Sequence, residues 1–180
     1  MMKLIHSKNN IVMDNIWNQI WKELKTYKTY ALCAREYASI QRKISVIYNI
    51  SIPLLAAICV FLAKIENYDA TIITACVILV SSGMKAIFPQ LMLSDKSLDA
   101  LDAVGTFFDK QSCEAQILMN GLRNKSISIN DAEKKLEELV KKKSGKETEL
   151  NKLVLWIPFW ENRRMIKQVE RELKETNNYE

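Results

Sequence analysis

The feature that most constrains this chain is the run from Ile44 to Ala63, which carries no charged side chain. About 20 apolar residues are what an α-helix needs to cross the hydrocarbon layer of a bilayer. The Leu, Ile, Val and Phe side chains of the run favour insertion by about 0.3 to 0.6 kcal/mol each, and no charge opposes them. Arg42 and Lys43 close the run on one side and Lys64 on the other. The run therefore predicts a membrane-spanning helix.

A second apolar run follows after the short connector "KIENYD" and extends from Ala70 to Pro89. Lys85 interrupts it near its end, where a lysine stem carries the ammonium toward the headgroups. The two runs predict a tight antiparallel hairpin with spans at about 44–63 and 70–89. The alternative is a soluble bundle with two very apolar helices, but a soluble helix keeps a polar face, and these runs are apolar nearly all round.

Basic residues near the spans indicate the orientation of the hairpin. Five of them flank its outer ends, and one lies in the connector: Arg35, Arg42, Lys43, Lys85 and Lys96 against Lys64. Lys and Arg gather on the cytoplasmic side of membrane proteins, so both termini are expected in the cytoplasm. Long helical sequence precedes the first run, so we do not expect that run to be a cleaved signal peptide.

The composition predicts an all-α protein. Four glycines and three prolines in 180 residues are few for a strand-rich fold, and Lys, Glu, Leu and Ile dominate outside the spans. The net charge of +5 fits a protein beside an anionic leaflet better than a nucleic-acid binder. The four cysteines are scattered and are expected to be buried, reduced thiols.

Helices are predicted on both sides of the hairpin, in an N-terminal cytosolic amphipathic helix (1–43) and in cytosolic helices over 90–180. Two sets of positions carry the apolar spacing. They are Trp17, Ile20, Trp21, Leu24, Tyr27, Ala31, Ala34 and Ala38 in the first region, and Leu98, Leu101, Val104, Phe108, Gln111, Ala115, Leu118 and Leu122 in the second. The heptad-like spacing predicts coiled-coil packing of the two arms, within a subunit or between subunits. Asp14 or Asn15 is expected to cap the first helix, and Asn130 with Glu133 to open a later one.

The sequence offers no catalytic site. The single histidine, His6, lies near the N-terminus, and the glycines are too far apart to form a phosphate-binding loop. Asp99, Asp102 and Asp109 share a helical spacing, which more often marks a solvated face than a metal site. We therefore expect no enzymatic activity, no cofactor, no metal and no direct nucleic-acid binding.

Polar and small residues recur along one side of each predicted span. On the second span they are Thr71, Thr74, Ile78, Ser81, Ser82 and Lys85. One interpretation is close helix packing. The other is a water-filled path lined by this stripe in an oligomer, with Lys85 forming a cationic ring at the cytoplasmic mouth. On the first span the series is Ser45, Asn49, Pro53, Ala56 and Ala57, and Pro53 removes a donor from the Asn49 carbonyl, which predicts a kink.

Four residues are candidate anchors at the membrane interface: Arg42, Lys43, Trp156 and Trp160. Trp and Tyr are enriched at that depth. For the two tryptophans of the "WIPFW" segment, the alternative is that they cover the end of a cytosolic helical bundle.

The layout resembles the SLATT family, the SMODS and SLOG-associating two-transmembrane effector domains. The resemblance covers nearly the whole chain and rests on "WNQIWKELKTYKTYALCAREYASIQRKISVIYNISIPLLAAI", the two close spans and a helical C-terminal region with "WIPFW". It implies a membrane effector in the inner membrane of a bacterium, triggered by a neighbouring nucleotide-signal synthase, nucleotide sensor or reverse transcriptase. It supplies no catalytic residues.

These observations together predict an antiviral, abortive-infection effector that forms homo-oligomers and opens a pore in, or disrupts, the inner membrane. The alternative is a membrane-anchored coiled-coil scaffold that recruits a cytosolic partner and does not conduct.

Overall fold

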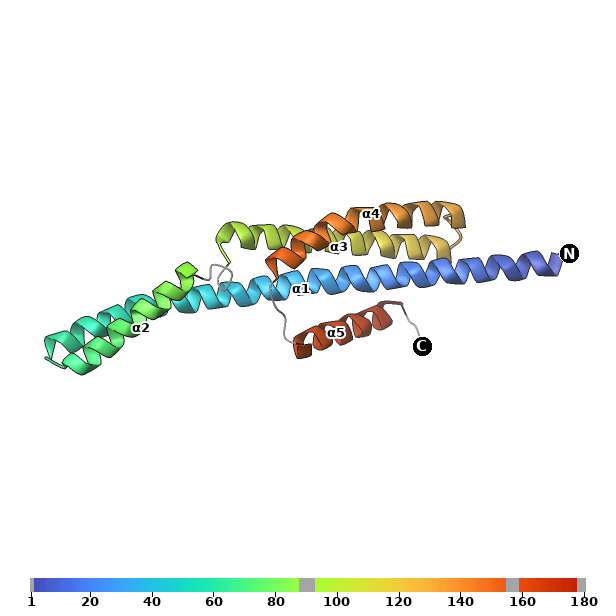
Figure 1. Cartoon of the computed structure of the whole chain (residues 1–180). Coiled ribbons are helices and arrows are strands. Elements are labelled where there is room, and N and C mark those ends of the chain that lie inside the picture. Colours follow the sequence, from blue (N-terminus) through green and yellow to red (C-terminus); the bar gives the residue numbers. More distant parts are fainter. Residues whose placement is uncertain (1, 88–92, 155–158, 178–180) are drawn as a thin grey trace. The chain divides into compact units, whose positions relative to one another are not determined.

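The computed structural model describes residues 2–87, 93–154 and 159–177, with side chains described over 13–83, 93–154 and 162–175. The described chain forms five α-helices and no strand (Figure 1). They are α1 (Met2–Lys64), α2 (Tyr68–Ile87), α3 (Asp95–Arg123), α4 (Ile129–Leu153) and α5 (Phe159–Asn177). The predicted all-α class is confirmed.

The helices divide into two compact units. The first, here called the helical unit, comprises Met1–Glu36 and Leu101–Glu180, and the second, the hairpin unit, comprises Tyr37–Ala100. Helix α1 contributes to both units, because no glycine or proline interrupts it before Pro53 and the helix continues through that proline to Lys64. These units are defined by contacts, whereas the boundaries 1–43, 44–89 and 90–180 follow from expected membrane crossings, and they stay a prediction.

Apolar stripes from α1 and α3 form the centre of the helical unit. On α1 the stripe is Ile16, Ile20, Leu24, Tyr27, Ala31 and Ala34, all buried, whereas Trp17 and Trp21 are half-buried. On α3 the buried residues include Leu101, Val104, Phe108, Gln111, Ala115, Leu118 and Leu122, each of which the heptad-like spacing identifies. The two buried positions Ala38 and Leu98 continue these stripes into the hairpin unit.

Aromatic rings and a glycine determine how α1 meets α3. The Phe108 ring lies 6.3 Å from the Tyr27 ring in a stacked arrangement and 5.1 Å from the Tyr30 ring in an edge contact. A Cβ atom at Gly105 would lie 3.3 Å from the Cβ of Ala34. The backbones therefore approach closely at Gly105, and the large rings fill the space one turn further along.

Helices α4 and α5 bury one face each. The buried positions are Ala132, Leu136, Leu139 and Leu150 on α4, and Met165, Val169 and Leu173 on α5. Figure 1 shows α3 and α4 alongside α1, with α5 beside α1 on a different side. An ion pair between Lys25 and Glu170 joins α5 to α1. A second pair, between Arg35 and Asp109, joins α3 to α1.

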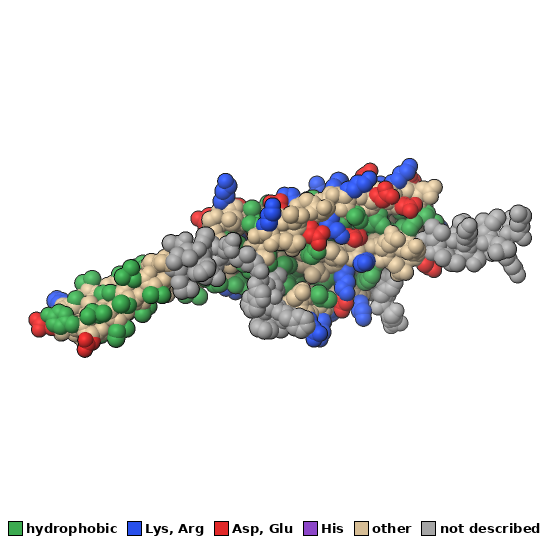
Figure 2. All heavy atoms as spheres, viewed as in Figure 1, with side chains coloured by type: hydrophobic (Ala, Val, Ile, Leu, Met, Phe, Trp, Pro, Cys, Tyr) green, Lys and Arg blue, Asp and Glu red, His purple; other side chains and the backbone are tan. Residues whose placement is uncertain are grey.

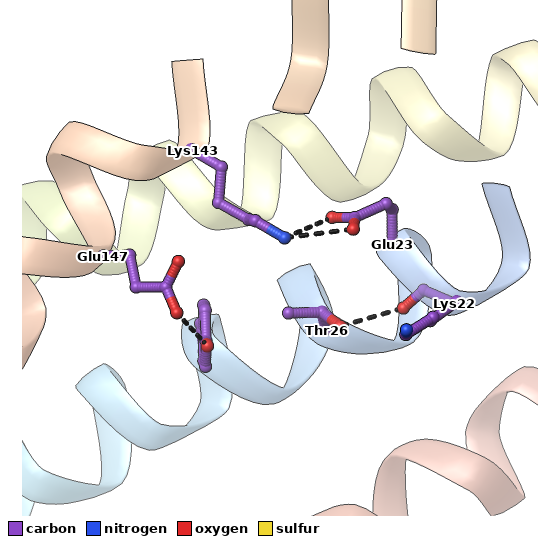
Figure 3. A network of polar contacts seen from close by, with 6 residues as sticks. Lys22, Glu23, Thr26, Lys143 and Glu147 are labelled. Atoms are coloured by element: carbon purple, nitrogen blue, oxygen red, sulfur yellow. Dashed lines mark hydrogen bonds and ion pairs between the residues drawn. The ribbon is translucent and has the colours of Figure 1, made fainter. Parts of the chain in front are cut away.

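A polar network ties α4 to α1 (Figure 3). The ammonium of Lys143 donates to both carboxylate oxygens of Glu23, at 3.0 and 2.7 Å, and these side chains are only 17% and 16% exposed. The hydroxyl of Tyr30 donates to Glu147 at 2.6 Å. The Lys143 ammonium also lies 5.9 Å from the centre of the Tyr27 ring. Because the ion pair is largely excluded from water, losing either partner leaves a poorly solvated charge.

Two predicted helix starts are wrong. The α4 cap is Ser128 and not Asn130, since the Ser128 hydroxyl accepts from the Asp131 N–H at 3.2 Å and the helix begins at Ile129. Both Ser-x-x-Asp and Asn-x-x-Glu spacings are present in the sequence, and the chain uses the earlier one. Helix α1 begins at Met2, before Asp14 and Asn15, because nothing between these positions stops a helix.

Helix α3 ends at Arg123, two residues after Gly121. Lys125 has a φ of 55°, and the Ser126 N–H donates back to the Gly121 carbonyl at 2.9 Å. This is a Schellman motif, in which a left-handed residue satisfies the last carbonyls of a helix. A non-glycine residue in that conformation is uncommon.

Candidate membrane-spanning hairpin

The turn between α1 and α2 reverses the chain within three residues. Glu66 has a φ of 57°, and its N–H donates to the Ala63 carbonyl at 3.1 Å while the Asn67 N–H donates to the Leu62 carbonyl at 3.1 Å. The Asn67 side chain then accepts from the Ala70 N–H at 3.3 Å. One Schellman motif therefore ends α1, and one N-cap begins α2.

Two contacts establish that the helices of the hairpin unit are antiparallel neighbours. The Cys59 thiol lies 3.7 Å from the Thr71 carbonyl near the turn, and the Tyr48 hydroxyl donates to the Ser81 carbonyl at 3.4 Å further from it. Moving back along α1 corresponds to moving forward along α2. The described part of the chain thus contains the paired arrangement that the sequence predicts for residues 44–63 and the start of the second run.

Half-buried residues form a seam between the two helices. On α1 they are Ser45, Tyr48, Ser51, Ile52, Leu55, Cys59 and Leu62, and on α2 they are Ala70, Thr71, Thr74, Ala75, Ile78 and Ser81. Four residues of the predicted polar stripe, Thr71, Thr74, Ile78 and Ser81, therefore belong to this seam. Ser82 is exposed, and the Lys85 side chain lies outside the described residues.

The threonine hydroxyls of the seam bond to their own helix. Thr71 Oγ1 donates to the Asn67 carbonyl and Thr74 Oγ1 to the Ala70 carbonyl, both at 2.8 Å. A hydroxyl satisfied in this way needs no water and presents its methyl group to a neighbour, which suits a helix contact in an apolar medium. The seam is polar in composition but internally satisfied at these two positions.

The small and polar positions of the first span do not share one environment. Ser45 is half-buried in the seam, whereas Asn49, Pro53, Ala56 and Ala57 are exposed. Pro53 lies inside α1, and the helix continues on both sides of it. The predicted kink at Asn49 and Pro53 stays a prediction.

Large apolar side chains cover the outside of the hairpin, as the green surface over α2 and the paired part of α1 illustrates in Figure 2. Among the most exposed are Val46, Ile47, Ile50, Leu54, Val60, Phe61, Ile72, Ile73, Leu79 and Val80, between 56% and 72% accessible. Only three exposed large apolar side chains, Met13, Ile117 and Val140, belong to the described part of the helical unit. Soluble proteins rarely expose a continuous apolar surface of this kind.

Hydropathy distinguishes the two helices of the hairpin. The best 18-residue window of α1 has a mean hydropathy of 2.3, and none of that window is buried. A core helix of a soluble protein would be buried. Among the residues with described side chains, α1 alone is long and apolar enough to cross a bilayer, and the apolar part of α2 is described as far as Gly83. Among the described residues, α1 is thus the one helix of membrane-spanning character, and a crossing by α2 requires separate support.

Charged residues mark the limits of the apolar surface. Arg42, Lys43 and Lys64 are exposed at the two ends of the first run. Trp156 and the side chain of Trp160, the other predicted anchors, lie outside the described residues. Long basic side chains at the ends of a membrane-spanning helix extend along it toward headgroups.

The titratable groups with shifted pKa values lie in the helical unit. Burial raises the pKa of the Cys33 thiol to about 11. Burial, together with the nearby Glu23 carboxylate, raises the pKa of Tyr27, and burial with the Glu147 hydrogen bond raises that of Tyr30. The four cysteines are free thiols, and their predicted burial is wrong for Cys76 and Cys113, which are exposed. The side chains described here form no cluster of three or more metal-ligating residues. The Cys33 thiol and the two tyrosine hydroxyls are therefore neutral at physiological pH.

Apart from Ser45, the α1 half of the seam was not predicted from the sequence. Tyr48 and Cys59 contact α2, and the signal for them was the 3–4 spacing of Ser45, Tyr48, Ile52, Leu55 and Cys59 within the uncharged run. Overall hydrophobicity concealed this spacing.

Comparisons with family models, with curated proteins and with solved structures find no match for this chain.

Proposed function

We propose that this chain is a SLATT-type membrane effector of bacterial antiviral defence. Its hairpin crosses the inner membrane twice, and copies of the chain assemble and permeabilise that membrane when a partner protein or a nucleotide signal triggers them. The single observation that carries the proposal is the exposed apolar surface around the hairpin, interrupted by no charge between Ile44 and Ala63.

The helical unit supports two crossings rather than one. Its core joins Tyr27 and Tyr30 of α1 to Phe108 of α3, so these segments lie on the same side of any membrane. The chain between them must then cross an even number of times. If the first run crosses, α2 returns, and its 20 residues are about 30 Å long, enough for the hydrocarbon layer.

A pore requires several hairpins, because two helices enclose no channel. The candidate lining is the polar stripe with Thr71, Thr74, Ile78, Ser81, Ser82 and Lys85. In the single chain most of this stripe faces α1, so the proposed open state separates α2 from α1 or exchanges the partner of the seam. A trigger then acts by shifting the equilibrium between the paired state of α1 and α2 and this open state.

The second candidate is a membrane-anchored scaffold without conduction. The observation that favours it is the seam itself, since Thr71 and Thr74 already satisfy their hydroxyls and pack within one hairpin. In this case the apolar surface anchors the chain, and the helical unit recruits a cytosolic partner.

Ion leakage from liposomes that contain the purified full chain, at rising protein density, separates the two candidates. A pore of several hairpins predicts leakage that increases more steeply than in proportion to density. Thr74→Val, which keeps the side-chain volume and removes the hydroxyl, and Lys85→Leu are expected to reduce it. Ile73→Leu, on the exposed apolar surface, is the matched control and is expected to leak like the unchanged chain.

The scaffold predicts no leakage at any density, with the products of the neighbouring genes present or absent. Leakage that Thr74→Val and Ile73→Leu leave equally unchanged would contradict a path through the stripe. Recovery of the chain in the soluble fraction without detergent would contradict both candidates.

A further inference from the structure

The cations of α5 gather on its outward face. Met165, Val169 and Leu173 are buried and hold the helix against the helical unit. At about 100° per residue, all five cations of α5 lie within about 60° of the line opposite that stripe. They are Arg163, Arg164, Lys167, Arg171 and Lys174, and all are exposed.

Carboxylates are kept away from the centre of this face. Glu170 points to the side, where it pairs with Lys25 of α1, and that ammonium lowers its pKa. Glu172 lies on the opposite flank by the same helical geometry, and the exposed Glu175 lies at the edge of the face, about 60° from its centre. By contrast, the outward face of α4 alternates in sign, with Lys134, Glu138 and Lys141 close together. The α5 face is therefore the concentrated positive surface of the described helical unit.

The shape of this face fits a surface better than a small molecule. Its cations are spread over 11 residue steps, about 16 Å of helix. Between the side chains lies an open groove of ≈ 720 Å³ whose described lining, Arg163, Arg164, Lys167, Gln168, Arg171 and Glu172, comes from α5 alone. Within the described residues, no second element closes over the groove to enclose a nucleotide. A strip of exposed guanidinium and ammonium groups complements an array of phosphates in one plane.

We propose that the outward face of α5 binds the anionic phospholipid headgroups of the membrane that the hairpin crosses. This inference rests on the proposed membrane location. Helix α1 runs without a break from the helical unit into the apolar run, so the tether keeps α5 near headgroups at high effective concentration. Arg forms bidentate hydrogen bonds with phosphate, and each cation near an anionic leaflet strengthens binding by about fivefold.

The test uses the full chain in lipid nanodiscs with an environment-sensitive fluorophore on Gln168→Cys, in a background without other cysteines. Gln168 lies in the groove and carries no charge. Discs of phosphatidylcholine alone are compared with discs that also contain phosphatidylglycerol, using headgroup-attached quenchers. We expect quenching to be several-fold stronger in the anionic discs, to weaken at high salt, and to fall to the neutral-disc level in the variant Arg163→Glu/Lys167→Glu/Arg171→Glu.

A matched control reverses charge elsewhere on the same unit: Lys134→Glu/Lys141→Glu on α4 is expected to leave quenching unchanged. Replacing the α5 cations by Gln instead of Glu provides a variant that adds no repulsion, and thermal unfolding checks that each variant folds. Inorganic phosphate in solution tests the other source of phosphate groups. If quenching is equal in the neutral and the anionic discs and millimolar phosphate reduces it in both, the proposal is overturned.

Equal quenching in neutral and anionic discs would overturn the lipid proposal and leave the membrane hairpin intact. A chain that does not enter discs at all would instead overturn the proposed function. The two failures are therefore distinguishable in one preparation.

Discussion

At the scale of single residues, two tyrosines one turn apart contribute to the core in different ways. Tyr30 donates a hydrogen bond to Glu147 at 2.6 Å. The Tyr27 hydroxyl is buried and has no hydrogen-bond partner among the described side chains, while its ring stacks on Phe108. A polar group buried without a partner costs free energy, so the ring of Tyr27 stabilises the fold and its hydroxyl does not.

This difference predicts opposite effects at neutral pH. Tyr30→Phe is expected to lower the free energy of unfolding by about 1 kcal/mol, because it leaves Glu147 without its donor. Tyr27→Phe is expected to be neutral or slightly stabilising. Thermal unfolding of the full chain in detergent, followed by circular dichroism, measures both. A larger loss for Tyr27→Phe than for Tyr30→Phe would contradict this account.

The same groups predict alkaline sensitivity. Burial raises the pKa of the Cys33 thiol from 9.0 to about 11, and the pKa of Tyr27 also rises. The unfolded chain then loses protons at lower pH than the folded chain, so stability is lost as pH rises through this window. The midpoint temperature of unfolding is expected to decrease as the pH is raised from 9 to 11, and to decrease less in Tyr27→Phe. A pH profile of Tyr27→Phe identical to that of the unchanged chain would contradict the role of Tyr27.

At the scale of helices, sequence periodicity predicted faces better than ends. All eight heptad-like positions from Leu98 to Leu122 are buried. The α4 cap was placed at Asn130 instead of Ser128, because two capping spacings overlap there and local sequence does not choose between them. The seam on the first span was missed for another reason. When every face of a helix is apolar, the buried face is as hydrophobic as the exposed faces, so the sequence does not show which face is buried.

The close approach of α1 and α3 depends on one glycine, Gly105. A Cβ at Gly105 would lie 3.3 Å from Ala34, whereas a Cβ at Gly145 of α4 would meet nothing within 4 Å. Gly105→Leu is therefore expected to lower the free energy of unfolding by at least about 1 to 3 kcal/mol, because the helices must separate. Gly145→Leu is expected to raise it by up to about 1 kcal/mol through helix propensity. Chemical denaturation of both variants is the measurement, and equal effects would contradict the packing described here.

At the scale of the whole molecule, one helix belongs to both units. Contacts with α3, α4 and α5 all converge on α1, through Asp109, Glu147 and Glu170 among others. Sequence predicted the hairpin because uncharged length is a strong signal. It did not predict the α5 face, since five cations mixed with four carboxylates look balanced along the chain, and the cations gather on one side only when the segment is wound into a helix.

The proposed double crossing predicts which side of the membrane each segment occupies. In a chain with Cys113 as the sole cysteine, the exposed thiol is expected to react with a membrane-impermeant maleimide only after cells are permeabilised. Asn18→Cys, on α1 of the same unit, is expected to behave identically, because α1 and α3 share one core. Ile65→Cys, at the turn, is expected to react in intact cells, because two crossings place the turn on the opposite side. Labelling of positions 18 and 113 from different sides would show a single crossing and would break the helical unit. Protection of position 65 in intact cells would mean that the hairpin enters the bilayer without crossing it, and a conducting oligomer of these hairpins would then be excluded.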